Sequence, residues 1–317
     1  MDMFIILEVI GLILGFVFLI KGSDIFVDGA SSIALLLKVP TVIVGLTVVA
    51  FGTSAPEAAV SITSSITGSN AMAVSNVIGS NIFNLLMVVG IAALLNELLM
   101  EEDVLKSDLP FLTIMTGVLA LVIFFFSGIP SIIGIGLLIV LIAYIFKLIR
   151  TAGESGSTHD VEKPKYDLKW SIVAAICGLA AIVIGGELVV YCASDIAIAL
   201  GMSETLVGLT IVAIGTSLPE LATSLTALNK GETDLVIGNV IGSNIFNILF
   251  VLGASSAISA ISLDSSILID TFLLLLFTVI FYIFGKSDQK FSKREGAFLV
   301  ICFIGYMAYA ISMNYLF

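Results

Sequence analysis

The sequence predicts an all-α polytopic membrane protein with ten transmembrane helices, arranged as two inverted-topology repeats of five helices. Three observations favour this fold class: an apolar composition, long apolar stretches and an internal repeat. Of the 317 residues, 59% are hydrophobic and only 12% are charged, and the mean hydropathy is +1.19. Soluble domains are about half apolar and about a quarter charged, so a lipid bilayer is the expected partner of this chain. We expect no nucleic-acid partner, because the net charge is −11 and phosphate binding needs clustered Lys and Arg.

The apolar stretches are long enough to cross a bilayer, which takes about 20 helical residues. They cover residues 3–37, 41–66, 71–96, 107–126 and 130–150 in the first half, and 169–200, 204–228, 234–260, 266–285 and 295–315 in the second. The first stretch of each half is too long for one perpendicular crossing. The first one also carries Lys21, Asp24 and Asp28 on one helical face. An internal ion pair, a helix end that projects into water and a role in the ion path remain open for these three residues.

An internal repeat relates the two halves. At one offset of 163 residues, Glu57 falls on Glu220, Asn84 on Asn247, and more than half of the surrounding residues are identical. We therefore expect a first five-helix repeat over residues 1–150 and a second over 169–317. A polar linker, residues 151–168, joins them. Because five is an odd number, the two repeats must enter the membrane from opposite sides, as in many secondary transporters.

The basic residues predict the orientation. If both termini lie outside, all of the 13 Lys and Arg residues except Lys21 fall in cytoplasmic loops or at the adjoining helix ends, and the outside loops hold none. Cytoplasmic loops of membrane proteins are rich in Lys and Arg. We therefore expect a multi-pass protein of the cell membrane whose linker lies in the cytoplasm.

Two matching segments form the candidate site: AFGTSAPE at Ala50–Glu57 and AIGTSLPE at Ala213–Glu220. Each places a glutamate directly after a proline within an apolar stretch. An ionisable group at membrane depth is costly, which makes it a functional candidate by default. Proline lacks a backbone donor and clashes with the carbonyl four residues earlier, so we expect a helix break and free carbonyls at Gly52 and Gly215.

Neutral oxygen ligands accompany each glutamate. Hydroxyl residues lie three and four positions before it, on the same helical face, and the next helix of each repeat adds a Ser and an Asn four positions apart. Carboxylate, hydroxyl and amide oxygens suit Na⁺, Ca²⁺ or Mg²⁺, not metals that prefer Cys or His. Packing of small residues explains the glycines and some serines, but not two glutamates. The side-chain candidates are Glu57, Thr53, Ser54, Ser80 and Asn84 in the first repeat, and Glu220, Thr216, Ser217, Ser243 and Asn247 in the second.

The segments GTSAPE and GTSLPE, followed by SNVIGSNIFN and GNVIGSNIFN, resemble the two alpha-repeats of the sodium/calcium exchanger branch of the cation/calcium antiporter superfamily. The alpha-repeat motifs correspond to residues 45–90 and 208–253, and the resemblance extends to the long first helix of each half. It implies a secondary antiporter that alternates access by sliding its two long first helices across a core. It also implies that the transported ions bind at the membrane midplane.

The resemblance further implies which atoms bind the ions. Ca²⁺ would bind at Glu57 and Glu220 together with the backbone oxygens of Thr53 and Thr216. Na⁺ would use the same glutamates and the four candidate serines, together with the carbonyls of Ala50 and Ala213. Asn84 and Asn247 fill the remaining central positions.

Two departures from the family pattern refine these expectations. Potassium-dependent exchangers are acidic at the position of Asn247, so the amide found here disfavours K⁺ co-transport. The linker is also too short for the large cytoplasmic regulatory domain of animal exchangers.

The favoured function is exchange of Na⁺ for Ca²⁺, and the nearest alternative is a Ca²⁺/H⁺ antiporter that uses the same glutamates. Proton/calcium exchangers usually resemble a motif with GN in place of GT, which disfavours that alternative. A cation channel is a further alternative, disfavoured by the inverted repeat. We expect no enzyme activity, because the only histidine, His159, lies in the polar linker and no ATP-binding loop is present. We expect no cofactor besides the transported ions, and function as a monomer.

Overall fold

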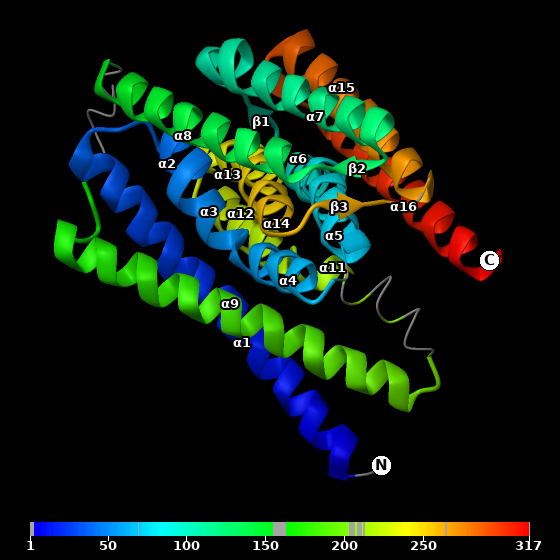
Figure 1. Cartoon of the computed structure of the whole chain (residues 1–317). Coiled ribbons are helices and arrows are strands. Elements are labelled where there is room, and N and C mark those ends of the chain that lie inside the picture. Colours follow the sequence, from blue (N-terminus) through cyan, green and yellow to red (C-terminus); the bar gives the residue numbers. More distant parts are fainter. Residues whose placement is uncertain are drawn as a thin grey trace.

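The computed structural model describes residues 3–68, 70–154, 163–202, 207, 211, 213–263 and 265–316. This part of the chain is almost wholly helical (Figure 1). The first half contains α1 (Met3–Leu37), α2 (Thr41–Val44), η1 (Gly45–Val49), α3 (Ala50–Thr53), α4 (Ala55–Ile66), α5 (Asn70–Phe83), η2 (Asn84–Val88), α6 (Val89–Leu95), β1 (Leu98–Leu99), η3 (Val104–Asp108), α7 (Leu109–Phe126), β2 (Gly128–Ile129) and α8 (Ser131–Glu154). The second half contains α9 (Leu168–Ala199), α11 (Ala213–Gly215), α12 (Leu218–Asn229), α13 (Thr233–Phe246), η5 (Asn247–Val251), α14 (Leu252–Ile258), β3 (Ile261–Ser262), α15 (Ser265–Asp288), β4 (Lys290–Phe291) and α16 (Lys293–Leu316).

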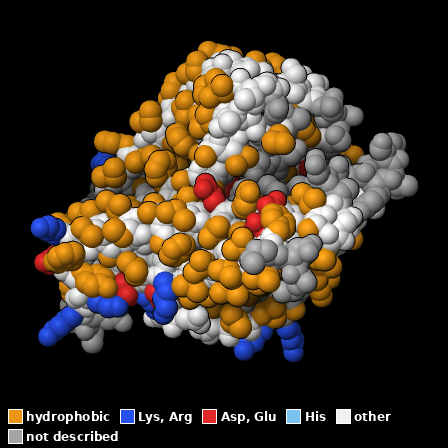
Figure 2. Space-filling view, turned by 90° about the horizontal axis from the view of Figure 1, so that it is seen from below, with side chains coloured by type: hydrophobic (Ala, Val, Ile, Leu, Met, Phe, Trp, Pro, Cys, Tyr) orange, Lys and Arg blue, Asp and Glu red, His pale blue; other side chains and the backbone are white. Residues whose placement is uncertain are grey.

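The described residues form eight helices that are long and apolar enough to cross a membrane. A bent pair, Thr41–Thr53 and Ala55–Ile66, makes a ninth crossing if it is one span. The prediction of a helical, polytopic membrane protein is confirmed, but the count of ten is not, because the span predicted at 204–228 falls partly outside the described residues. Figure 2 shows hydrophobic side chains over much of one face, as a surface in contact with lipid requires.

The helices form a long pair and a core. α1 and α9 lie against each other along one side of the molecule, and the remaining helices gather on the other side (Figure 1). At the centre of the core, every residue of α13 from Leu235 to Phe246 is buried. Helices from different repeats pack against each other around this centre, namely α7 with α15, α8 with α14, and α16 with α6.

Glycines join α1 to α9. A Cβ atom placed on Gly22 would lie 2.9 Å from the carbonyl oxygen of Gly178, and one placed on Gly15 would lie 3.0 Å from that of Gly185. Small residues let helix backbones approach this closely in membranes. Because the lower-numbered residue of α1 meets the higher-numbered residue of α9, these two equivalent helices of the repeats run in opposite directions.

The acidic residues of α1 bind lysines from other elements. Asp28 forms ion pairs with Lys165 at 2.5 Å and with Lys230 at 2.7 Å, and Lys230 also donates to the backbone carbonyl of Asp24 at 2.7 Å. Lys21 is exposed. The hydrogen bond from Lys165 to Asp28 raises the pKa of Lys165 above its ordinary value. Of the three alternatives, the ion pair within α1 is not formed in the described structure. Asp28 instead pairs with a lysine of the linker and with one in the turn between α12 and α13.

The contact between α1 and α9 predicts the effect of one methyl group. We expect Gly22→Ala to lower the melting temperature of the purified protein in detergent, because the new Cβ atom would meet backbone atoms of α9 at 2.9 Å. Overpacking of this kind typically costs about 1–3 kcal/mol. A matched control is Gly136→Ala on α8, where a Cβ atom meets nothing within 4 Å. Equal melting temperatures for the two variants would contradict the close approach.

Candidate functional site

Both glutamates lie in the first turn of a helix that follows a break. α3 ends at Thr53, Ser54 leaves the helical conformation with φ −81° and ψ 7°, and α4 begins at Ala55 with Pro56 in its first turn. Proline is well tolerated at that position because its missing N–H has no partner there in any helix. The helix axis bends by 48° at this break. A carboxylate at such a helix start is favoured by the positive end of the helix dipole.

The second repeat has the same arrangement. Ser217 has φ −94° and ψ 6°, and α12 starts at Leu218 with Pro219 and Glu220 in its first turn. The expected helix break is thus present in both repeats. The Ser54 N–H that approaches the Gly52 carbonyl donates to the Ala50 carbonyl at 3.0 Å, so the expectation of a free Gly52 carbonyl stays a prediction. The same expectation for Gly215 stays a prediction.

Hydrogen bonds between the repeats join the two motifs. Ser54 of the first repeat donates to Oε1 of Glu220 at 3.2 Å, and Ser217 of the second repeat donates to Oε1 of Glu57 at 3.1 Å. Ser80 adds a further bond to Oε1 of Glu57 at 3.3 Å. Both glutamates are fully buried, with 0% of each side chain exposed. The candidate residues from distant parts of the chain therefore meet in one buried site.

The two candidate asparagines are held by a second pair, Asn81 and Asn244. The side-chain nitrogen of Asn84 donates to Oδ1 of Asn244 at 3.3 Å, and that of Asn247 donates to Oδ1 of Asn81 at 3.0 Å. Sequence reasoning missed Asn81 and Asn244, although both lie in the repeated GSNIFN segment. These bonds occupy the amide nitrogens, which leaves the carbonyl oxygens of Asn84 and Asn247 for another partner.

Among the buried oxygens that lack a hydrogen-bond partner in the described residues are four carboxylate and amide oxygens of this site: Oε2 of Glu57, Oε2 of Glu220, Oδ1 of Asn84 and Oδ1 of Asn247. A buried acceptor without a partner costs about 1–3 kcal/mol, so such groups point to a ligand or a functional role. Two carboxylate and two amide oxygens suit a hard cation such as Ca²⁺ or Na⁺. The described residues contain no group of three or more His, Cys, Asp or Glu that could hold a metal ion, so any ion here relies largely on neutral oxygens.

The candidate threonines differ between the repeats. Oγ1 of Thr53 donates to Oδ1 of Asn239 at 3.1 Å and lies 3.4 Å from Oγ of Ser243, the remaining candidate serine. Oγ1 of Thr216 is buried and has no partner in the described part of the chain. The Ala50 carbonyl accepts the N–H of Ser54 at 3.0 Å, and Ala213 begins α11.

Another pair of asparagines donates hydrogen bonds to the backbone carbonyls of the glutamates. Sequence reasoning missed this pair too. Asn76 donates to the backbone carbonyl of Glu57 at 3.4 Å, and Asn239 donates in the same way to Glu220 at 3.4 Å. The side-chain nitrogen of each asparagine also donates, at 3.0 Å, to a serine that lies one helical turn after the glutamate on the glutamate's own helix. The signal was available, since both asparagines occupy the same position in the repeat.

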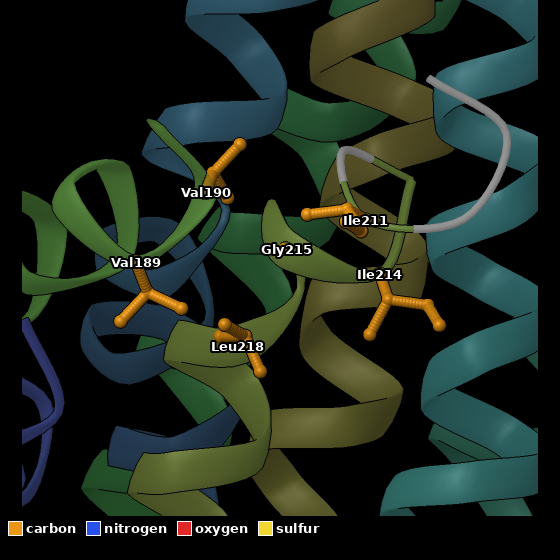
Figure 3. A pocket seen from close by; sticks show the side chains of 6 residues that line it. All are labelled: Val189, Val190, Ile211, Ile214, Gly215 and Leu218. Atoms are coloured by element: carbon orange, nitrogen blue, oxygen red, sulfur yellow. The ribbon is translucent and has the colours of Figure 1, made fainter. Parts of the chain in front are cut away.

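An apolar pocket of about 250 Å³ adjoins the second motif, between α9 and the break that precedes α12. Figure 3 shows the six residues that line it, Val189, Val190, Ile211, Ile214, Gly215 and Leu218. Because this lining offers almost no polar surface, the pocket supplies no cation ligands, and the ion-binding chemistry belongs to the buried oxygens described above.

The model of the family described as sodium/calcium exchanger protein matches residues 7–150 and 170–312 of this chain. CaxA of Alkalimonas amylolytica is 40% identical over 305 residues, which is 93% of this chain and 95% of CaxA. The sodium/calcium exchanger MaX1 of Methanosarcina acetivorans is 34% identical over 337 residues, covering 93% of this chain and 96% of MaX1.

Solved structures agree with these relatives. The sodium-calcium exchanger NCX_Mj, soaked with Na⁺ and Sr²⁺, superposes with a TM-score of 0.85 at 32% identity, covering 96% of this chain and 98% of NCX_Mj. The family match spans both halves of the chain, and the structural match includes the long helix pair and the core. The chain therefore belongs to the sodium/calcium exchanger family of membrane antiporters and is a transporter, not an enzyme.

Proposed function

We propose that the chain exchanges Na⁺ for Ca²⁺ across the membrane by alternating access, with the ions bound at the midplane between Glu57 and Glu220. The observation that carries this proposal is the set of four unpartnered buried oxygens, two from carboxylates and two from amides. MaX1 and NCX_Mj, which resemble this chain over nearly its full length, are both named as sodium/calcium exchangers.

The charge of the site accounts for antiport. When both glutamates are ionised they carry −2, which one Ca²⁺ neutralises and which several Na⁺ ions can also offset. An empty site would leave two carboxylates uncompensated in a medium where isolated charges are very costly. We therefore expect the site to hold cations whenever its access changes from one side of the membrane to the other. Na⁺ and Ca²⁺ must replace each other because both need the same oxygens.

The neutral ligands suit release as well as binding. Ca²⁺ takes six to eight oxygen ligands, and sites with more carboxylates bind it more tightly. The described residues of the site supply two carboxylates, so the ion is shared with serine, asparagine and backbone oxygens. In this proposal Na⁺ binds at the glutamates, at Ser54, Ser217, Ser80 and Ser243, and at the carbonyls of Ala50 and Ala213. Ca²⁺ adds the backbone oxygens of Thr53 and Thr216.

The proposal includes the organisation expected from the repeat and the orientation expected from the basic residues. The two five-helix repeats cover residues 1–150 and 169–317, both termini lie outside, and the linker of residues 151–168 lies in the cytoplasm. The monomer contains the complete site, because both repeats contribute to it.

The test is uptake of radiolabelled Ca²⁺ into proteoliposomes loaded with Na⁺, and then with K⁺ or choline at the same pH. We expect uptake only with internal Na⁺. Uptake driven by a proton gradient and indifferent to Na⁺ would instead show Ca²⁺/H⁺ exchange. Flux without any counter-ion would show a channel and contradict the proposal.

We expect Glu57→Gln and Glu220→Gln each to reduce Na⁺-dependent Ca²⁺ uptake by about a hundredfold or more, because loss of one partner of a buried ion pair costs about 3–5 kcal/mol. Glu97→Gln is the matched control. It also removes one carboxylate, but one that is partly exposed and pairs with Lys290 at 2.9 Å away from the site. Uptake that survives in both site variants would contradict the assignment of the glutamates.

We further propose a stoichiometry of three Na⁺ to one Ca²⁺, which moves one net charge in each cycle. A potential of 100 mV then changes the equilibrium by about 2.3 kcal/mol, which is about a fiftyfold change in the Ca²⁺ gradient. The measurement is Ca²⁺ accumulation in proteoliposomes whose potential is set with K⁺ and valinomycin. Accumulation that does not respond to the potential would show an electroneutral exchange instead.

A further inference from the structure

Two equivalent threonine–asparagine pairs flank the glutamates, one on each side. At the repeat offset, Thr53 corresponds to Thr216 and Asn76 to Asn239. The described structure has the first pair bonded, with Oγ1 of Thr53 donating to Oδ1 of Asn239 at 3.1 Å. The second pair is not bonded, since Oγ1 of Thr216 is buried and has no partner among the described residues. The two halves of one pseudo-symmetric site are thus in different states.

The bonded pair is also more deeply buried than the unbonded pair. Thr53 and Asn239 are both 0% exposed, whereas Thr216 is 8% exposed and Asn76 is only half-buried. The half of the site that holds the bonded pair, called the sealed half below, is less exposed than the half that holds the unbonded pair.

The sealed half faces the linker. Asn239 lies between Ser243 of the site and the turn that carries Lys230, and Lys230 pairs with Asp28, which also holds Lys165 of the linker. Asn76 lies on the other side of the glutamates, toward the turn between α4 and α5. The ion pairs of Asp28 therefore tie α1 to the core on the same side as the bonded pair.

The bonded pair also connects the two repeats to a glutamate. Asn239 accepts from Thr53 of the first repeat and donates to the backbone carbonyl of Glu220 in the second, at 3.4 Å. Asn76 already donates to the Glu57 carbonyl at 3.4 Å. Its arrangement lacks only the bond from Thr216 to match that of Asn239.

We propose that the Thr53–Asn239 and Thr216–Asn76 contacts are reciprocal positioning contacts, one of which forms when its side of the site closes and breaks when that side opens. This inference rests on the proposed alternating access and adds the residues that favour one access state over the other. The Thr53 hydroxyl lies beside Asn239, Ser243 and Glu220, so its bond to Asn239 holds it next to the site. The threonine backbone oxygens stay available to the ion.

Isosteric variants test the contact. Thr53→Val removes the bond seen here, so the linker-side-closed state should lose population. The half-saturating Ca²⁺ concentration on the linker side should fall by up to about fivefold, and that on the opposite side should rise, since one net hydrogen bond contributes about this factor. Thr216→Val should shift both concentrations in the opposite directions. Membrane vesicles of the two orientations give both values.

Three controls separate positioning from a structural role. Thr53→Ser and Thr216→Ser keep the hydroxyl and should restore wild-type sidedness. Thr116→Val removes an equally buried hydroxyl that bonds only to the carbonyl of Leu112, at 2.9 Å, and should leave sidedness unchanged. Shifts of the same sign in the two site variants would overturn the proposal.

Hydrogen–deuterium exchange of the full chain in detergent gives a readout that does not need transport. Thr53→Val should speed amide exchange at residues 233–239, and Thr116→Val should not. If the wild-type chain shows no exchange of Na⁺ for Ca²⁺, the proposed function fails, while this experiment still decides the contact. Unchanged amide exchange in Thr53→Val would overturn the contact even if transport is intact.

Discussion

The burial of two carboxylates within an apolar helical core is the constraint on which the rest of this structure depends. Glu57 and Glu220 are fully buried, and water is not available there to solvate them. The helix breaks place both at helix starts, where the helix dipole favours negative charge. Serines from the opposite repeat donate to one oxygen of each carboxylate. These features lower the cost of burial without neutralising the charge. In the proposed function a bound cation neutralises it.

The internal repeat gives the site two equivalent halves, one from each repeat. Equivalent helices run in opposite directions, so each half of the site has a counterpart that faces the other side of the membrane. Perfect symmetry would leave the two access states equal. The chain departs from symmetry at several places, including the lysines that bind Asp28 on the linker side and the single Thr53–Asn239 bond. In the proposed alternating access, such differences set the balance between the two states.

Much of the fold and the centre of the site could be predicted from the sequence. Apolar stretches of about 20 residues and the repeat predicted a helical membrane protein, because every backbone group in lipid must be satisfied within a helix. The glutamates were identifiable because charge is rare at that depth. Most candidate hydroxyl and amide residues lie where the pattern placed them, since side chains three and four positions apart share a helical face.

The partners across the repeats could not be predicted. The bond from Ser54 to Glu220 joins residues 166 positions apart, and only tertiary packing brings them together. The same holds for Asn84 with Asn244, and for Asp28 with Lys230 in place of Lys21.

The most direct test of the central claim is to locate the bound ion. Crystals of the chain soaked with Sr²⁺, a heavier analogue of Ca²⁺, allow the ion to be found by anomalous scattering. The account predicts one strong peak within coordination distance of Oε2 of Glu57 and Oε2 of Glu220, which weakens as Na⁺ is raised. A peak elsewhere with none at these glutamates, or a peak indifferent to Na⁺, would contradict the claim that the four unpartnered oxygens form the exchange site.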